Sequence, residues 1–150
     1  MKRAAACLLI ALSGCASVPE ATPERDAEAK QFETRPGAGT LYVFRNDSSG
    51  NAWQDDSVLY IDDRLIGATL PGTFFRIDLQ PGRHELSGYG HDRGSLRIRL
   101  ADGEARFVAL NVIGGTSHFV PMAAPAGKRE IARCCVLMES WQPGQRPLLR

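Results

Sequence analysis

Apolar and polar residues alternate over short stretches of the chain from Thr40 onward, and turn-forming residues separate these stretches. Residues 74–79 and 96–100 place apolar side chains at every second position, with charged side chains between them. This period of two gives a β-strand one apolar face. Stretches rich in β-branched and aromatic residues predict further strands at 41–44, 58–61, 65–67, 104–112 and 130–139. The pattern predicts an all-β fold, a small antiparallel β-sandwich of about eight strands, with no helix after Phe32.

The residues between the predicted strands favour tight turns. Residues 80–83 have the composition of a type II turn, because proline fixes φ at the second position and glycine accepts positive φ at the third. Asp102-Gly103 predicts a two-residue hairpin. Asp62 and Asp63 are adjacent carboxylates, which suit acid–base catalysis, but neighbouring strand residues point to opposite faces. We therefore interpret them as a type I′ turn in which Asp63 stands where glycine fits more easily.

Two segments are too long to be simple turns. Residues 46–57 contain Trp53, and residues 114–129 contain Phe119. Long loops on a rigid β scaffold often carry binding residues, so Trp53 and Phe119 are candidate partner-binding residues. The alternative is that each ring folds back and closes an end of the sandwich.

The first fifteen residues differ in character from the rest of the chain. Lys2 and Arg3 precede ten uncharged, mostly apolar residues, 4–13. A membrane-spanning helix needs ~20 such residues, whereas ten fit the apolar part of a signal peptide. The next residues, Leu12-Ser13-Gly14-Cys15, resemble the bacterial lipobox, whose cysteine sulfur receives a diacylglyceryl group and whose amine is acylated after cleavage. Residues 1–14 are the predicted signal peptide, and Cys15 is the predicted lipidation site.

The segment that follows Cys15 resembles a tether between a lipid anchor and the domain predicted at 40–150. Residues 15–39 contain several prolines and small or charged residues. They either form a short helix at 23–32, with Thr22 as its cap and Pro23 at its first position, or remain coil that spans ~27 Å. Ala16 follows the cysteine, and by resemblance to the sorting rule of enteric-type bacteria this favours the outer membrane, with the domain in the periplasm.

Charge and known motifs narrow the classes of function. Without residues 1–14 the chain carries 16 basic and 17 acidic side chains, a net charge of −1. A nucleic-acid-binding protein is expected to show a basic excess, so we predict no nucleic-acid partner. The sequence contains no phosphate-binding loop, dinucleotide fingerprint or nucleophile elbow, and we predict no cofactor and no catalytic residue.

The three histidines do not form a metal-binding pattern. His84, His91 and His118 have no repeated short spacing of the kind that zinc sites show. His84 follows the turn at 80–83, and we expect it to be hydrogen-bonded and half-buried. His118 neighbours Ser117, but adjacency in sequence does not make a catalytic triad. The alternative function is a lipid-anchored metal-dependent or hydrolytic enzyme that uses His84 and His118.

Two adjacent cysteines, Cys134 and Cys135, lie within the predicted strand 130–139. Alternation along a strand sends them to opposite faces. Buried reduced thiols, an intermolecular bridge and a vicinal disulfide all remain open, since an oxidising periplasm permits disulfides.

Four segments together resemble one family of bacterial lipoproteins. They are LYVFR (41–45), LYIDDRLIG (59–67), LQPGRHELS (79–87) and EARFVALNV (104–112). Their order and spacing resemble the DUF2846 family, and the middle two also resemble PEGA-type β modules of envelope proteins. The likeness spans roughly residues 28–140 and implies a lipid-anchored β domain without catalytic residues. We therefore expect a non-catalytic binding or structural module of the outer membrane, with an unknown envelope protein or a peptidoglycan component as partner.

Overall fold

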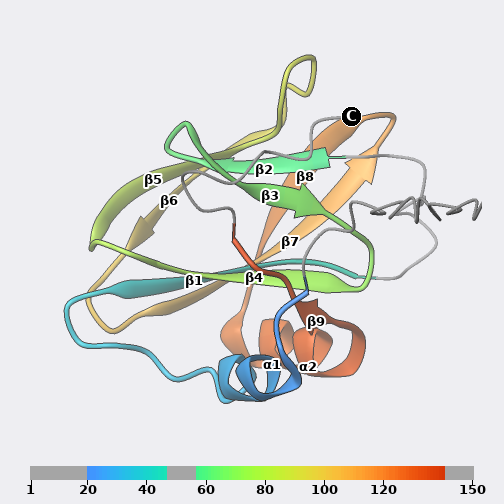
Figure 1. Cartoon of the computed structure of the whole chain (residues 1–150). Coiled ribbons are helices and arrows are strands. Elements are labelled where there is room, and N and C mark those ends of the chain that lie inside the picture. Colours follow the sequence, from blue (N-terminus) through green and yellow to red (C-terminus); the bar gives the residue numbers. More distant parts are fainter. Residues whose placement is uncertain (1–19, 47–56, 141–150) are drawn as a thin grey trace, which may run out of the picture.

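The computed structural model describes residues 20–46 and 57–140, and about half of these residues belong to two β-sheets (Figure 1). The elements are α1 (Pro23–Ala29), β1 (Gly39–Arg45), β2 (Ser57–Ile61), β3 (Arg64–Thr69), β4 (Thr73–Leu79), β5 (Gly82–Ser87), β6 (Ser95–Leu100), β7 (Ala105–Ile113), β8 (Thr116–Met122), α2 (Ala124–Cys134) and β9 (Val136–Leu137). One sheet has the strand order β8-β7-β1-β4-β9, and the other has the order β3-β2-β5-β6. The predicted all-β sandwich is confirmed.

Two of the strand pairs are parallel, although the sequence pattern predicted an antiparallel sandwich. β1 pairs in parallel with β7, and β4 pairs in parallel with β9. The first of these pairs arises at Asp102-Gly103, which we expected to close a hairpin. That turn instead carries the chain from β6 in the four-stranded sheet to β7 in the five-stranded sheet. It is held by Gly103 N–H, which donates to the Ala38 carbonyl over 2.9 Å, and by Gly37 N–H, which donates to Asp102 Oδ1 over 2.7 Å.

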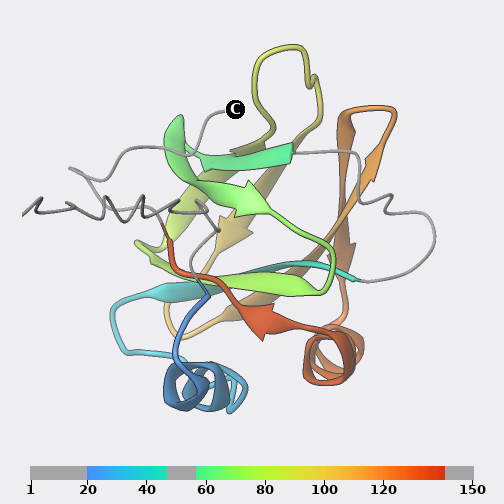
Figure 2. The same cartoon turned by 45° about the vertical axis from the view of Figure 1, so that its right-hand side comes forward.

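The five-stranded sheet has a hydrophobic core on each of its faces. Leu41 and Val43 of β1 belong to the core between the two sheets. Tyr42 and Phe44 belong to a second core that also contains residues of both helices. Every residue of β1 is therefore buried, as expected for a strand covered on both faces. The helices lie on the side of this sheet away from the four-stranded sheet and form a third layer (Figure 2).

The segment predicted as the long loop 114–129 contains most of a hairpin instead. Gly114 and Gly115 both have positive φ, 56° and 76°, and join β7 to β8 in a two-residue turn. Positive φ at both central residues is what a type I′ hairpin requires. Glycine accepts this backbone without steric cost, and β8 therefore begins directly after the pair.

Helix α2 corrects both the predicted strand at 130–139 and the expectation of no helix after Phe32. Gly127 and Ile131 are buried four residues apart, which places them on one face of a helix. Ile131 and Cys135 are also four residues apart, a spacing that places two side chains on one face of either a helix or a strand, so these two residues fit either period. Packing decides between them: a Cβ on Gly127 would lie 2.5 Å from Phe107 Cβ, so the glycine allows α2 to approach β7 closely.

The short helix expected after Pro23 is present as α1, and the Thr22 hydroxyl caps it by accepting from Arg25 N–H. The helix is packed against the sandwich: Leu137 N–H donates to Asp26 Oδ1 over 2.8 Å, and Ala21 N–H donates to the Leu137 carbonyl over 2.9 Å. Part of the predicted tether 15–39 is thus attached to the domain and is not free chain.

Candidate functional site

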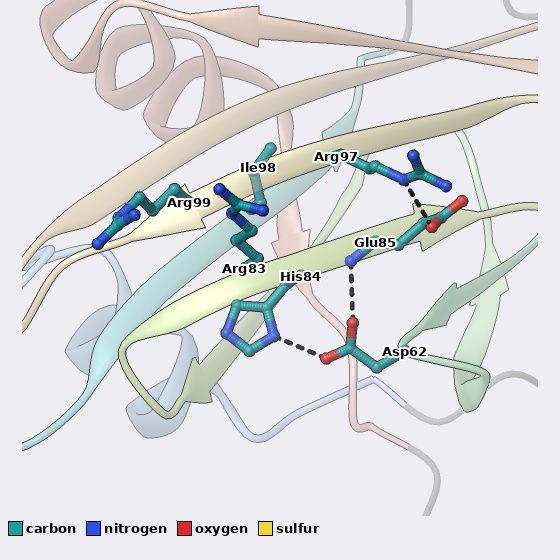
Figure 3. Close-up of a pocket in the computed structure, with 7 residues that line it drawn as sticks. All are labelled: Asp62, Arg83, His84, Glu85, Arg97, Ile98 and Arg99. Carbon is teal, nitrogen blue, oxygen red and sulfur yellow. Dashed lines mark hydrogen bonds and ion pairs between the residues drawn. The ribbon is translucent and has the colours of Figure 1, made fainter.

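The Asp62-Asp63 turn joins β2 to β3 and has the predicted conformation. Asp62 has φ of 51° and Asp63 has φ of 60°, so both residues occupy the left-handed region that a type I′ turn uses. The two carboxylates do not act together. Asp62 Oδ1 accepts a hydrogen bond from Glu85 N–H over 2.9 Å, and its Oδ2 lies 2.6 Å from His84 Nδ1 (Figure 3).

His84 is held between two hydrogen-bond acceptors. Its Nδ1 faces the Asp62 carboxylate, and its Nε2 lies 2.8 Å from the Gln80 carbonyl oxygen. A carbonyl oxygen cannot donate, and an ionised carboxylate cannot either, so both ring nitrogens must carry a proton. The arrangement therefore selects the imidazolium form of His84, with a side chain that is 10% exposed. The predicted hydrogen-bonded, half-buried histidine is confirmed.

The charges of this pair shift both pKa values. Burial lowers the pKa of His84, but the hydrogen bonds to Asp62 and the Gln80 carbonyl and the charge of Asp62 outweigh it, so the pKa is raised. Burial raises the pKa of Asp62, but the hydrogen bonds from His84 and Glu85 N–H and the charge of His84 lower it overall. In the imidazolium form both nitrogens donate, and His84 then has no free lone pair with which to bind a metal or take a proton from a substrate.

His118 lies apart from His84. It is exposed on β8 in the five-stranded sheet, opposite Asn111, whereas His84 lies on β5 in the other sheet. Within residues 20–46 and 57–140, no group of three or more histidine, cysteine, aspartate or glutamate side chains could hold a metal ion.

Ser117, the neighbour of His118, has a structural role. Its hydroxyl lies 2.7 Å from the hydroxyl of Ser57, and both residues are buried. Asp92 Oδ1 accepts from Ser117 N–H over 2.8 Å and from Gly94 N–H over 2.9 Å. This network holds the loop between β5 and β6 against β8.

Three arginines line a shallow depression of about 660 Å³ beside the Asp62–His84 pair. Across the β5–β6 ladder, Arg83 stands opposite Arg99, and Glu85 stands opposite Arg97. Arg97 Nε donates to Glu85 Oε2 over 3.0 Å. We call the outward surface formed by Arg83, Glu85, Arg97 and Arg99 the arginine face (Figure 3).

The carboxylates beside this face already have partners. Asp62 pairs with His84, and Glu85 pairs with Arg97. Neither Arg83 nor Arg99 forms an ion pair within the part of the chain that the structure describes. Like charges placed directly opposite on neighbouring strands destabilise a sheet. The two guanidinium groups therefore form a site where an external anion would be stabilised.

A second depression, of about 220 Å³ beside α1, shows the contrast. It also contains three arginines, but ion pairs join Arg25 to Glu139 and Arg35 to Asp78. The positive charges of Arg25 and Arg35 are therefore compensated within the protein, and an external anion would gain less from this depression than from the arginine face.

Two stacked tyrosines lie near the other end of the four-stranded sheet. The ring centroids of Tyr60 and Tyr89 are 5.8 Å apart, with an angle of 14° between the rings. Tyr60 is paired with Ser87 across β2 and β5, so its side chain shares a face with Ser87, Glu85 and Arg83. Burial and then the neighbouring Tyr89 raise the pKa of Tyr60. Tyr89 is 55% exposed and presents an open ring.

The remaining predicted site residues have other positions. Cys15 and Trp53 lie outside the described residues. Phe119, a candidate contact residue, lies on β8 opposite Leu110 and packs half-buried against the core between the sheets. Its ring packs onto the sandwich, as in the alternative expectation, and a role for Phe119 in partner binding stays a prediction.

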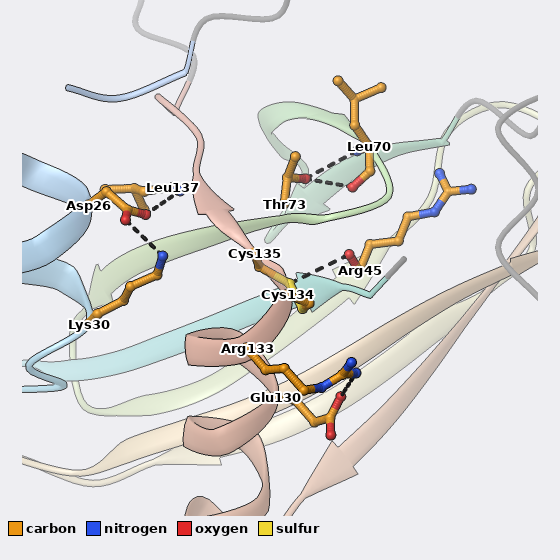
Figure 4. Close-up of a disulfide and its surroundings, with 10 residues drawn as sticks. All are labelled: Asp26, Lys30, Arg45, Leu70, Thr73, Glu130, Arg133, Cys134, Cys135 and Leu137. Atoms are coloured by element: carbon orange, nitrogen blue, oxygen red, sulfur yellow. Dashed lines mark hydrogen bonds and ion pairs between the residues drawn. A yellow bond between two sulfur atoms is a disulfide. The ribbon is translucent and has the colours of Figure 1, made fainter. Parts of the chain in front are cut away.

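Cys134 and Cys135 form a vicinal disulfide (Figure 4). The pair lies at the junction of α2 and β9 and not inside a strand, so strand alternation does not separate the sulfurs. Cys135 is buried, with its sulfur 3.8 Å from the Arg45 carbonyl oxygen. The disulfide belongs to the second core and lies away from the arginine face.

Comparison with known proteins places the chain in a family. An uncharacterised protein of Haemophilus influenzae is 33% identical to it over 128 residues, which cover 81% of this chain and 75% of that protein. The chain belongs to the family of this Haemophilus protein. No protein-family model matches the chain. The relationship brings no activity with it, so the chemistry must be argued from the site.

Proposed function

We propose that the chain is a DUF2846-like lipoprotein of the bacterial outer membrane that acts as a non-catalytic binding module of the cell envelope. Its lipid would be attached to Cys15, and its domain would face the periplasm. The lipobox-like segment supports the anchor. Neither α1 nor α2, the helices of the described residues, is long and apolar enough to cross a membrane.

The observation that carries the binding role is the uncompensated Arg83–Arg99 pair on an open sheet face. A protein that needed only to fold would gain stability by replacing one of these arginines, because their like charges repel. The chain has both, and the Asp62 carboxylate that lines the same depression is already paired with His84. This arrangement suits the recognition of an anion and provides no free base or nucleophile.

The attachment of Glu20 to the sandwich limits how far the domain can lie from a lipid on Cys15. Glu20 already pairs with Met138 as a β-bridge on the sandwich. Five residue steps separate Cys15 from Glu20, and a fully extended chain covers at most ~18 Å in five steps. A lipid-anchored domain would therefore stay beside the bilayer surface and find its partner there.

Two measurements test this proposal. Mass spectrometry of the mature N-terminus should show Cys15 as the first residue, with lipid on its sulfur and its amine; an unmodified Cys15 or another first residue refutes the anchor. A photo-reactive amino acid at Ser95, beside the arginine face, should form adducts in living cells. The same probe at Ala132, exposed on α2, is the matched control. Equal labelling at both positions would refute a binding role for the arginine face.

A further inference from the structure

We propose that the arginine face binds a phosphorylated oligosaccharide, with a phosphomonoester between Arg83 and Arg99 and the sugar extending toward Tyr60 and Tyr89. The inference rests on the proposed function only in taking this face as the binding surface. It does not depend on the lipid anchor.

Charge balance favours a phosphomonoester over a carboxylate. The pair Arg83 and Arg99 carries two positive charges without an internal counter-ion among the described residues. A phosphomonoester carries a charge of about −1.5 to −2 at pH 7 and three acceptor oxygens. A carboxylate carries one charge and two oxygens. Two guanidinium forks on neighbouring strands, with Cβ atoms ~5 Å apart, suit the larger anion.

The neighbouring carboxylates are held so that they do not compete with the ligand. Asp62 lines the same depression as Arg83, but His84 and Glu85 N–H occupy its two oxygens. Glu85 accepts from Arg97. His84 and Asp62 are therefore positioning residues, which keep the guanidinium of Arg83 available without touching the ligand.

The outward face continues from the arginine pair to the tyrosines. Ser87 lies four residues beyond Arg83 on β5, a distance of ~14 Å along a strand, and Tyr60 stands beside Ser87. This length exceeds one sugar ring, so the ligand would be an oligosaccharide. Between the two ends, Ser87 pairs with Ser95, and Glu85 pairs with Arg97, which together offer donors and acceptors for sugar hydroxyls.

The aromatic end fits a sugar better than a peptide side chain. Tyr89 is supported from below by Tyr60 and leaves one ring face open, and such a flat apolar surface suits the C–H face of a pyranose. The phenol hydroxyls can bond to neighbouring sugar hydroxyls. An apolar peptide side chain would require a concave pocket, whereas this face is an open sheet surface.

Calorimetric titration of the chain from residue 15 onward with Cys15→Ser tests the proposal, because this form carries neither the lipid nor the apolar segment 4–13, either of which could insert into vesicles. The probes are a glucosamine disaccharide monophosphate, the same disaccharide without phosphate, and inorganic phosphate. We expect the phosphorylated disaccharide to bind at least about tenfold more tightly than either of the others, because it engages both ends of the face. Equal binding of the two disaccharides overturns the proposal, and the vesicle measurement below decides the case in which neither free disaccharide binds.

Variants locate the site. Arg83→Gln and Arg99→Gln should each weaken binding of the phosphorylated disaccharide about tenfold or more. Arg129→Gln, on α2, removes the same charge from the opposite side of the molecule and should leave binding unchanged. Tyr89→Ala should weaken binding of the disaccharide monophosphate but not that of inorganic phosphate. An equal effect of Arg129→Gln would show that net charge, and not this site, governs binding, which contradicts the proposal.

A binding measurement with lipid vesicles distinguishes a lipid-linked phosphorylated sugar from a soluble or polymeric one. Phosphatidylcholine vesicles with and without a lipid-linked form of the phosphorylated disaccharide are offered to the same chain. Binding in this arm alone identifies a lipid headgroup, and binding of the free sugar as well identifies a soluble or polymeric source; both support the phosphosaccharide site. Failure in both arms, together with strong labelling from Ser95 in cells, would overturn the ligand class and leave the binding module standing.

Discussion

The two sheets of this protein use β-strands in opposite ways. The five-stranded sheet is covered on both faces, and its central strand β1 is buried at every position. The four-stranded sheet is covered on one face, and its outer strand β6 places Arg97 and Arg99 in solvent between the buried Ile98 and Leu100. The first sheet offers little surface to a ligand, whereas the second carries two arginines, Arg83 and Arg99, that form no ion pair among the described residues.

This difference suggests a division of roles, in which the buried faces stabilise the fold and the open face of the four-stranded sheet recognises a ligand. Residues that face both cores lower the free energy of the folded state through apolar burial. Arg83 and Arg99 raise it, since opposed like charges cost free energy. The following predictions test whether the two sheets divide these roles, from the largest expected effect to the smallest.

Phe107→Ala should lower the free energy of unfolding by ~3–5 kcal/mol, because the ring fills the core between β7 and the helices. Tyr89→Ala on the open face should lower it by ~1 kcal/mol or less, which is the value of an exposed aromatic stack. Urea denaturation measures both variants. Similar losses would break the proposed division of roles between the two sheets.

The double variant Cys134→Ala, Cys135→Ala tests whether packing or the covalent bond holds the helix layer. A disulfide between neighbouring residues closes the shortest of loops, so it constrains the unfolded chain little. We expect a loss of ~1 kcal/mol in thermal or urea unfolding, with α2 retained in its circular dichroism spectrum. Global unfolding of the variant would show that the disulfide, and not packing, secures this layer.

His84→Gln should produce a pH-dependent loss of stability at the end of the open sheet. The contribution of His84 is fully present below the unfolded histidine pKa, ~6.5, and is lost as the pH rises through its raised pKa in the fold. The contribution of Asp62 is present above ~3.9 and is lost as the pH falls through its lowered pKa.

The wild type should therefore exceed His84→Gln most between about pH 4 and 6.5, by ~1 kcal/mol or less for this partly exposed pair. The difference should shrink at higher pH. Denaturation across this pH range measures it, with Asp62→Asn as the matched variant. A constant difference at every pH would contradict the charged pairing.

Comparison of Asp62→Gly with Asp63→Gly distinguishes the effect of backbone conformation on stability from the effect of side-chain contacts. Both aspartates have positive φ, so glycine relieves the same backbone cost at either site. Asp63→Gly should raise stability by ~0.5 kcal/mol. Asp62→Gly should gain less or lose stability, because it removes the contacts to His84 and Glu85 N–H. Equal gains in thermal melts would show that the Asp62 contacts contribute nothing.

Arg99→Gln should raise stability by a few tenths of a kcal/mol while it weakens binding of the phosphorylated disaccharide. A gain in stability together with a loss of affinity is expected only if the arginine pair binds a ligand and destabilises the fold. Arg129→Gln, on the helix-covered side, should change neither quantity. A destabilising Arg99→Gln would show that Arg99 supports the sheet.

Several features of the fold were predictable because they depend on neighbouring residues. The alternation in 96–100 and the apolar run of 41–44 identify β6 and β1, and Thr22-Pro23 identifies the start of α1. Helix α2 was missed because Ile131 and Cys135 fit a strand period and a helix period equally well. Only the close contact of Gly127 with Phe107 selects the helix, and that contact joins distant parts of the chain.

The sequence by itself determined the strands β1 to β4, β6 and β7 and the positive-φ turn at Asp62-Asp63, since these follow from the local periodicity and backbone preferences of adjacent residues. The tertiary structure decided the parallel pairing of β1 with β7, the helix layer and the arginine face. Asp62 reaches His84 across 22 positions, and Arg83 meets Arg99 through strand register. Contacts of this kind depend on strand register. Register is set by the packing of the entire apolar face and not by the residues that come into contact.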